Sequence, residues 1–313
     1  MATIPVIIGP TASGKSNLAL ALAMCTDSDI ISLDSMQIYQ GLDIGTAKVT
    51  PAERKAVKHH LIDIIPPTEN YSIADFLSAY NKLIAQLQKS KRKYLLVGGS
   101  LQYLSAIWYN DSYTEISGVN PDYREKLQKE YLQYAANHPD NKQNPVYLQL
   151  CALDPERAAV LHPNDCKRIV RALEIIAATA NPASAYRFEH KSNQSHLYTL
   201  FAYDRPREEL YSRINERVLM MVKEGLLQEA RKVYEHRNEY SQSCLQAIAY
   251  KEFFPYFEGK MGLDDAIASL QLNSRHYAKR QLSIMRKLPI NYLPVNAENS
   301  TIITNIKNKC SLY

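Results

Sequence analysis

The chain has 313 residues, of which 46% are hydrophobic and 22% are charged. These values are ordinary for a globular protein and exclude a disordered or fibrous chain. The length allows a full α/β core with one or two smaller helical units. Lys and Arg number 37 against 32 Asp and Glu, so the formal net charge is +5. This excess is too small to identify a polyanionic partner, and the distribution of the charges matters more.

The five cysteines are scattered, with no C-x-x-C pair and no His pair at zinc-finger spacing. We therefore expect reduced thiols and no zinc. The first residues resemble a strand and not a signal peptide, and no run of about 18 uncharged apolar residues occurs. These features predict a cytoplasmic protein without a membrane partner.

A glycine-rich loop joins an apolar run at residues 4–8 to an Ala- and Leu-rich helical stretch that begins at Asn17. Its residues match the pattern G-x-x-x-x-G-K-[ST] and are Gly9, Pro10, Thr11, Ala12, Ser13, Gly14, Lys15 and Ser16. Glycines let consecutive backbone amides turn toward an anion above the N-terminus of the next helix. Lys15 supplies a charge, and the Ser16 hydroxyl holds Mg²⁺. The loop predicts a diphosphate site, but kinases, ATPases, GTPases and some transferases share it.

Short apolar runs rich in β-branched residues predict strands at residues 5–8, 30–33 and 94–97. A helical pattern covers residues 72–89, with Ser72 as N-cap and Asp75 in an acidic variant of the capping box. Strands that alternate with helices predict an α/β protein with a P-loop NTPase-like parallel sheet core. Ligands of such sheets gather at the carboxyl ends of the strands, so the three strand endings should meet in one cleft.

Polar residues follow the second and third predicted strands. Asp34 ends the second strand, and Ser35, Met36 and Gln37 come next. A carboxylate beside a phosphate loop can be a Mg²⁺ ligand, a general base or a helix N-cap. The third strand ends in two glycines and Ser100, where a kinase or ATPase would carry Asp. The glycines allow backbone amides to approach a ligand, and this arrangement suits a diphosphate held at both ends.

Composition and periodicity divide the rest of the chain. A polar, Tyr-rich stretch with a helical pattern at residues 121–134 predicts an inserted helical unit, and residues 196–203 predict one more strand. The predicted organisation is a first core part at 1–109, the helical insertion at 110–160, a return to the core at 161–205, a helical C-terminal region at 206–290 and a tail at 291–313.

Two stretches concentrate basic residues. A helix capped by Asn164 and Asp165 carries Lys167, Arg168 and Arg171, which can either pair with Asp165 and Glu174 at the surface or neutralise a leaving diphosphate. Residues 274–287 contain no acidic residue and five basic ones, Arg275, Lys279, Arg280, Arg286 and Lys287. Such a helix face is either solvated or contacts a phosphate backbone.

His59 and His60 are adjacent and would point to opposite faces of a strand, so we do not expect them to share a metal.

Nine sequence blocks occur in the order seen in tRNA dimethylallyltransferases, and the chain resembles that family over residues 3–287. The blocks lie at residues 9–16, 34–39, 43–48, 59–63, 97–100, 162–165, 168–174, 247–252 and 278–281. Enzymes of that family transfer the dimethylallyl group of dimethylallyl diphosphate to the exocyclic N6 amine of the adenosine 3′-adjacent to the anticodon, in tRNAs expected to read codons that start with U.

The resemblance implies roles for individual residues. Residues 9–16 would bind the diphosphate of the donor, with Mg²⁺ as cofactor at Ser16. Asp34 would accept the proton of the adenine amine, while Ser100 and Arg168 would contact the leaving group.

The resemblance also implies that the insertion and the basic C-terminal region grip the anticodon stem-loop of tRNA. The implied tRNA-binding residues are Asp34, Ser35, Met36, Gln37, Ser100, Arg124, Lys167, Arg168, Ile169, Val170, Arg171, Arg275, Lys279 and Arg280.

Some positions depart from the family pattern, mainly in the RNA-facing blocks. Lys167 replaces a usual Gln, Ala249 replaces Gly, and Ile284-Met285 replaces an aromatic pair. Three other functions remain possible at this point. They are an adenylate isopentenyltransferase that acts on free AMP, ADP or ATP, a P-loop small-molecule kinase, and a catalytically weakened tRNA-binding homologue.

Overall fold

A computed structural model describes residues 3–109, 120–138, 140–186 and 195–310 of the chain. The chain divides into two compact units. The first contains Met1–Asp111 and Lys191–Tyr313, and the second contains Ser112–His190. Of the helices in the described residues, none is both long and apolar enough to cross a membrane.

The first unit is built on one parallel sheet with the strand order β3-β2-β4-β1-β5-β6, which confirms the predicted α/β class. The strands are β1 (Ile4–Ile8), β2 (Asp29–Leu33), β3 (His59–His60), β4 (Tyr94–Gly98), β5 (Tyr198–Asp204) and β6 (Ile290–Pro294). β4 is hydrogen-bonded to both β1 and β2. The three strand endings that the sequence analysis singled out therefore lie side by side.

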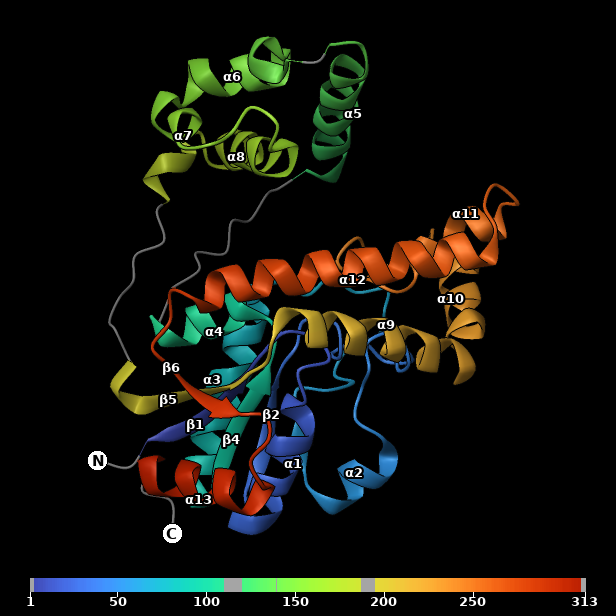
Figure 1. Cartoon of the computed structure of the whole chain (residues 1–313). Helices are drawn as coiled ribbons and strands as arrows, with labels where there is room; N and C mark the ends of the chain where they lie inside the picture. Colours follow the sequence, from blue (N-terminus) through green and yellow to red (C-terminus); the bar gives the residue numbers. More distant parts are fainter. Residues whose placement is uncertain (1–2, 110–119, 139, 187–194, 311–313) are drawn as a thin grey trace. The chain divides into compact units, whose positions relative to one another are not determined.

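Helices cover both faces of this sheet, as buried parallel strands require (Figure 1). Ile7 of β1 packs in one apolar cluster with residues of α1 (Lys15–Thr26) and α13 (Asn299–Cys310). Its neighbours Val6 and Ile8 pack in another cluster with residues of α3 (Ile73–Lys89) and α4 (Leu101–Trp108). This alternation follows from the two-residue period of a strand. The helices of the first unit are α1 (Lys15–Thr26), α2 (Pro51–Ala56), α3 (Ile73–Lys89), α4 (Leu101–Trp108), α9 (Arg207–Lys223), α10 (Leu226–Glu235), α11 (Phe254–Phe257), α12 (Leu263–Met285) and α13 (Asn299–Cys310).

Two boundaries of these helices bear on the sequence analysis. The predicted capping box of α3 is present, because the amide of Asp75 donates to Ser72 Oγ at 3.2 Å and the amide of Ser72 donates to Asp75 Oδ2 at 2.8 Å. The basic stretch at 274–287 belongs to a longer helix, α12, which ends at Met285. Arg286 is its C-cap, so the helix ends two residues before the end of the predicted basic segment.

The sequence analysis assigned residues 291–313 to a tail, but their described part belongs to the core. β6 pairs along β5 from Leu200↔Ile290 to Asp204↔Pro294. Ile302 and Ile306 of α13 are buried in the same cluster as α1. The short β6 has little strand pattern of its own, and its pairing partner β5 lies about ninety residues earlier in the chain.

The second unit consists of helices around their own apolar core, which includes Leu127, Leu150, Ile169 and Leu173. The helices are α5 (Pro121–Asn137), α6 (Pro145–Leu153), α7 (Pro155–Ala159) and α8 (Cys166–Thr179). Short 3₁₀ helices in the two units occupy Asn141–Gln143, Ala183–Ala185, Ser195–Leu197, Cys244–Gln246 and Lys251–Phe253. The predicted return to the core at residue 161 is therefore corrected, because the apolar face of α8 packs against α5 and α6.

Candidate active site

A cavity of about 260 Å³ lies in the first unit at the carboxyl ends of β1, β2 and β4. Lys15 and Ser16 of the phosphate loop, Asp34 after β2 and Gly99 after β4 all line it. The predicted cleft is thus present. Residues of α9 and α12 form other parts of its wall, including Arg217, Ser274, Tyr277 and Gln281.

The phosphate loop turns sharply into α1. Gly14 is the N-cap of this helix, with a left-handed φ of 95° that side-chain-bearing residues rarely adopt. Lys15 is the first helical residue, and its Nζ donates to the carbonyl of Pro10 at 3.3 Å. The N-terminus of a helix carries partial positive charge. The loop therefore presents a helix end and an ammonium group to the same cavity.

Arg217 of α9 adds a second cation that the sequence analysis did not select. Burial and the nearby charge of Arg217 lower the pKa of Lys15 to about 8, against the opposing effect of Asp34. Burial also lowers the pKa of Arg217, which Asp34 and Glu224 partly offset. Two cations held close together favour a polyanionic ligand. Arg217 lies in a charge-rich helix without a motif, so only the fold reveals its position.

The carboxylate of Asp34 is held by the turn that follows β2. Its Oδ1 accepts hydrogen bonds from the amides of Met36 at 2.9 Å and Gln37 at 3.4 Å. These hydrogen bonds do not begin a helix, since residues 35–38 form turns and bends. Asp34 also acts electrostatically on Lys15 and Arg217. The carboxylate is therefore oriented by the backbone and lies close to the cations.

Ser100 connects the ends of β2 and β4. Its Oγ accepts from the amide of Ser35 at 2.9 Å and donates to Ser35 Oγ at 3.2 Å. Tyr277 of α12 is hydrogen-bonded to Ser100, and burial together with the charge of Asp34 raises the pKa of Tyr277 to about 12. Tyr277 therefore stays protonated at neutral pH. The sequence analysis missed this residue because it considered only the charges of the helix.

Gln281 of α12 bridges the two loops that border the diphosphate region. Its Oε1 accepts from the amide of Thr11 at 3.2 Å, and its Nε2 donates to the carbonyl of Gly99 at 2.8 Å. A Cβ on Gly99 would lie 2.4 Å from this Nε2. The sequence predicts that this glycine lets backbone amides approach a ligand. In the structure its missing side chain admits Gln281.

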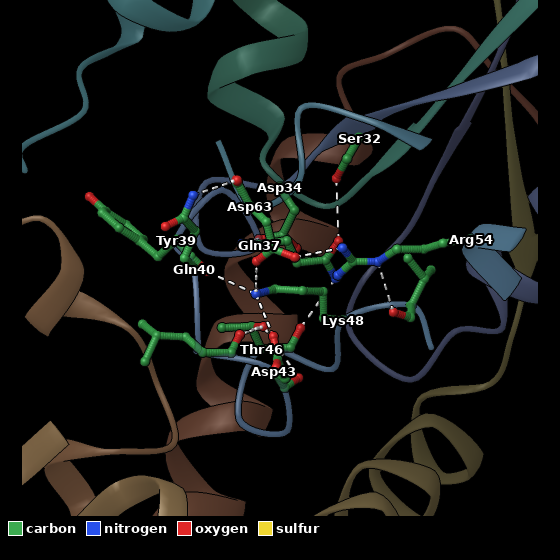
Figure 2. Close-up of polar contacts among 12 residues, drawn as sticks. Ser32, Asp34, Gln37, Tyr39, Gln40, Asp43, Thr46, Lys48, Arg54 and Asp63 are labelled. Atoms are coloured by element: carbon green, nitrogen blue, oxygen red, sulfur yellow. Dashed lines mark hydrogen bonds and ion pairs between the residues drawn. The ribbon is translucent and has the colours of Figure 1, made fainter. Parts of the chain in front are cut away.

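The four residues Asp34, Ser35, Met36 and Gln37 all line the cavity. The amide of Gln37 is engaged inside the protein, because Nε2 donates to the carbonyls of Thr46 and Ala47, each at 3.2 Å, and Oε1 accepts from Ser32 Oγ at 3.3 Å. Figure 2 shows Gln37 between Ser32 and the loop that carries Thr46. This residue therefore supports the loop, and its predicted RNA contact stays a prediction.

Three further predicted site residues belong to the second unit, where the ion pairs foreseen as one alternative are present, although Glu174 is buried. Arg168 pairs with Asp165, and Arg171 lies 3.6 Å from Glu174. Arg124 makes two hydrogen bonds to the same Glu174 carboxylate, at 2.5 and 2.8 Å. Their roles toward a diphosphate or an RNA stay predictions.

The neighbouring positions on α8 differ in exposure. Lys167 is exposed, whereas Ile169 and Val170 are buried in the core of the second unit. These two apolar side chains hold α8 in place, and their predicted RNA contact stays a prediction.

On α12 the predicted RNA-binding residues divide in a similar way. Lys279 and Arg280 are exposed, and the Arg280 guanidinium lies 5.7 Å from the centre of the Tyr277 ring. Arg275 donates to Asn215 Oδ1 at 2.6 Å and is partly buried. Lys279 and Arg280 are thus available to phosphates, and Arg275 is tied to α9.

Comparison with known proteins agrees with this geometry. Residues 37–288 match the model of the IPP transferase family. The tRNA dimethylallyltransferase of Bacillus subtilis (strain 168) is 38% identical over 316 residues, which cover 99% of this chain and 98% of that protein. The solved tRNA isopentenylpyrophosphate transferase of Bacillus halodurans is 36% identical, with a TM-score of 0.69 over 99% of this chain and 96% of that one.

A eukaryotic dimethylallyltransferase, solved while acting on tRNA, is 26% identical with a TM-score of 0.76, covering 100% of this chain and 81% of that one. Both structures share the P-loop NTPase-like architecture of the first unit. The chain therefore belongs to the IPP transferase family, together with the tRNA dimethylallyltransferases.

Proposed function

We propose that this protein transfers the dimethylallyl group of dimethylallyl diphosphate to the N6 amine of the adenosine 3′-adjacent to the anticodon of tRNA. One observation carries the proposal: a single cavity holds two cations, Lys15 and Arg217, next to the oriented carboxylate of Asp34. The cations suit a diphosphate leaving group and the carboxylate suits a base. Membership of the family supplies the substrate class.

Lys15, Arg217 and the phosphate loop would bind the diphosphate and neutralise the charge that develops on it. Ser16 and Asp34 offer oxygen atoms in the same cavity. Mg²⁺ prefers oxygen ligands and usually combines one or two protein groups with substrate phosphates, so these residues fit the ion. When bound, Mg²⁺ would add charge neutralisation at the diphosphate, with Ser16 as its protein ligand.

Asp34 would act on the acceptor. The adenine N6 attacks the allylic carbon, a C–N bond forms, the C–O bond to the diphosphate breaks, and the amine proton passes to Asp34. The adenine must leave its stack to reach the cavity, at a cost of about a few kcal/mol. The Ser100 hydroxyl, held by Ser35 and Tyr277, would contact the leaving group, and Arg168 is assigned the same role through the family resemblance.

Labelled dimethylallyl diphosphate tests the proposal. The purified protein with Mg²⁺ should label an anticodon stem-loop that carries adenosine next to the anticodon, and it should leave AMP unlabelled. Labelling of AMP alone would favour the adenylate isopentenyltransferase. Tight binding of ATP without any response to dimethylallyl diphosphate would favour a kinase.

A further inference from the structure

The loop at residues 43–48 forms one wall of the active-site cavity. Gly45, Thr46 and Ala47 line this cavity, and Ala47 also lines a second hollow of about 720 Å³ together with Asp43 and Lys48. The loop therefore lies between the two spaces, and its conformation decides the shape of the catalytic one.

Lys48 holds this loop from inside. Its side chain is 1% exposed, and its ammonium donates to the carbonyl of Tyr39 at 2.8 Å, to Asp43 Oδ1 at 2.6 Å and to Asp63 Oδ1 at 2.5 Å. Arg54 pairs with the other oxygen of Asp63 at 2.5 Å, as Figure 2 shows. All three ammonium protons have acceptors, which a buried Lys requires.

Glu229 of α10 holds the same loop from the other side. Its Oε2 accepts from the amides of Asp43 at 2.9 Å and Ile44 at 3.0 Å, and its Oε1 accepts from the amide of Gly45 at 2.9 Å. Tyr250 Oη donates to the same Oε1 at 2.7 Å. Three consecutive amides around one carboxylate form an anion nest. A Cβ on Gly45 would lie 2.7 Å from the Tyr250 ring, so the ring packs directly on this backbone.

The held loop is connected to the catalytic carboxylate. The side-chain Nε2 of Gln37 donates to the carbonyls of Thr46 and Ala47, and the backbone N–H of Gln37 donates to Asp34 Oδ1. Hydrogen bonds and the short stretches of backbone between them therefore connect Glu229, through the loop and Gln37, to Asp34. Glu229 does not itself line the cavity.

We propose that Glu229 and Lys48 are positioning residues, which hold the 43–48 loop so that Asp34 and the cavity wall are shaped for the acceptor adenosine. The role rests on the proposed prenyl transfer. Glu229 acts through backbone amides, because its carboxylate is the acceptor of three of them. Lys48 acts by connecting Asp43 at the start of the loop to Asp63 and to the carbonyl of Tyr39 through its ammonium group.

Glu229→Gln is the sharpest test, because it keeps the size of the side chain and one of its two oxygen acceptors. The other oxygen is replaced by an NH₂ group, which would face N–H or O–H donors of the loop and Tyr250. We expect kcat with the stem-loop to fall about 10- to 100-fold, as misplacement of catalytic groups does. The Kd for dimethylallyl diphosphate, measured by calorimetry without RNA, should change less than about threefold, since the phosphate loop is untouched. Glu235→Gln, at an exposed position of the same helix, is the matched control and should behave as wild type.

Lys48→Met should show the same split between kcat and donor Kd, with Lys55→Met at an exposed position as its control. Hydrogen exchange gives a readout independent of activity. In Glu229→Gln the amides of Asp43, Ile44 and Gly45 should exchange faster, while those of β1 and β4 keep their wild-type rates.

An unchanged kcat, a donor Kd that weakens in parallel with kcat, or unchanged loop exchange would overturn the proposal. If Glu229→Gln does not fold, Tyr250→Phe serves as the second variant, because it removes one of the four hydrogen bonds to the Glu229 carboxylate. It should lower kcat several-fold. A wild-type kcat in Tyr250→Phe would count against the proposal. Wild-type protein that prenylates no stem-loop would instead refute the proposed function, whereas active wild type with an equally active Glu229→Gln refutes only the positioning role.

Discussion

At the scale of single residues, the cavity holds two cations, Lys15 and Arg217, together with one carboxylate, Asp34. Burial lowers the pKa of both Lys15 and Arg217, the charge of Arg217 lowers that of Lys15 as well, and Asp34 partly compensates. The cost of this arrangement is recovered when a diphosphate binds, since the ligand neutralises both cations. The charge state of Lys15 should therefore control binding of the donor.

The pH dependence of donor binding follows from the pKa of Lys15, which is about 8. Below that pH the Lys15 ammonium is charged and the affinity for the diphosphate is at its maximum. Above that pH the Lys15 amine must take up a proton before it can pair with the diphosphate. We expect the Kd for dimethylallyl diphosphate to rise by up to about tenfold per pH unit above pH 8. Calorimetry between neutral and alkaline pH measures this, and Lys15→Arg should flatten the curve. A wild-type Kd that is constant over this range would contradict the assignment.

Replacement of Asp34 separates its charge from its structural role. Asp34→Asn keeps an Oδ1 acceptor for the amides of Met36 and Gln37, so the turn should survive. Without a base, the single-turnover rate should fall about 10²- to 10⁴-fold while the donor still binds. Asp34→Ala, which also loses the turn, should be at least as slow. Prenyl transfer by Asp34→Asn at the wild-type rate would show that another group accepts the proton.

At the scale of elements, polar and charged side chains hold the edge strand β3 to the start of β2. Asp29 begins β2 and is 3% exposed; it bonds His60 Nε2 and Arg92 Nε, each at 2.8 Å. The adjacent His59 ring bonds the carbonyl of Val57 at 2.8 Å. The two histidines thus have separate partners, as their opposite orientation on a strand predicts. These contacts connect β2 to β3 and to the end of the segment after α3.

Asp29→Asn should destabilise the fold in a pH-dependent way. Burial alone raises the pKa of Asp29, but the hydrogen bonds from His60 and Arg92 outweigh burial and leave the pKa below its usual 3.8. The ionised form therefore stabilises the fold above the unfolded pKa, and this contribution disappears as the pH falls through the folded pKa. We expect a loss of about 1–3 kcal/mol at pH 7. Urea denaturation at neutral and acid pH measures it; an equal loss at both would contradict the ionic origin.

At the scale of the whole molecule, the side chains that line the cavity differ from many of those expected to bind RNA. The first unit carries the cavity, and α12 serves two purposes within it. Tyr277 and Gln281 face the cavity, while Lys279 and Arg280 face solvent. The second unit has its own core and its own basic helix, α8. RNA binding should therefore depend on charges that do not affect the donor.

The salt dependence of RNA binding tests this division. Lys279→Ala and Arg280→Ala should each weaken binding of the stem-loop. Each should also reduce the slope of log Kd against log salt by about one, the contribution of a single phosphate contact. The donor Kd should stay at its wild-type value because neither side chain lines the cavity. Lys260→Ala, at an exposed pair with Glu258, is the control. Unchanged RNA affinity at low salt in both variants would remove α12 from the RNA surface.

The sequence alone determined the local features of this protein. The phosphate loop, the strand before it and the polar endings of β2 and β4 are each encoded within a few residues, by glycines, by β-branched runs and by capping side chains. The rule that parallel strands present their carboxyl ends together then placed Lys15, Asp34 and Gly99 in one cleft. The ordered sequence blocks predicted the family from the same local information.

Only the tertiary structure decided the rest, because it depends on which distant surfaces pack together. Arg217, Tyr277 and Gln281 join the cavity from distant parts of the chain, and Glu229 lies 186 residues from Asp43 of the 43–48 loop. The same holds for β6, which needs β5 as a partner, and for α8, whose apolar face fits α5 and α6 and not the sheet. Hydrophobic periodicity shows that a face is buried, but the partner of that face is selected by the packing of the whole chain.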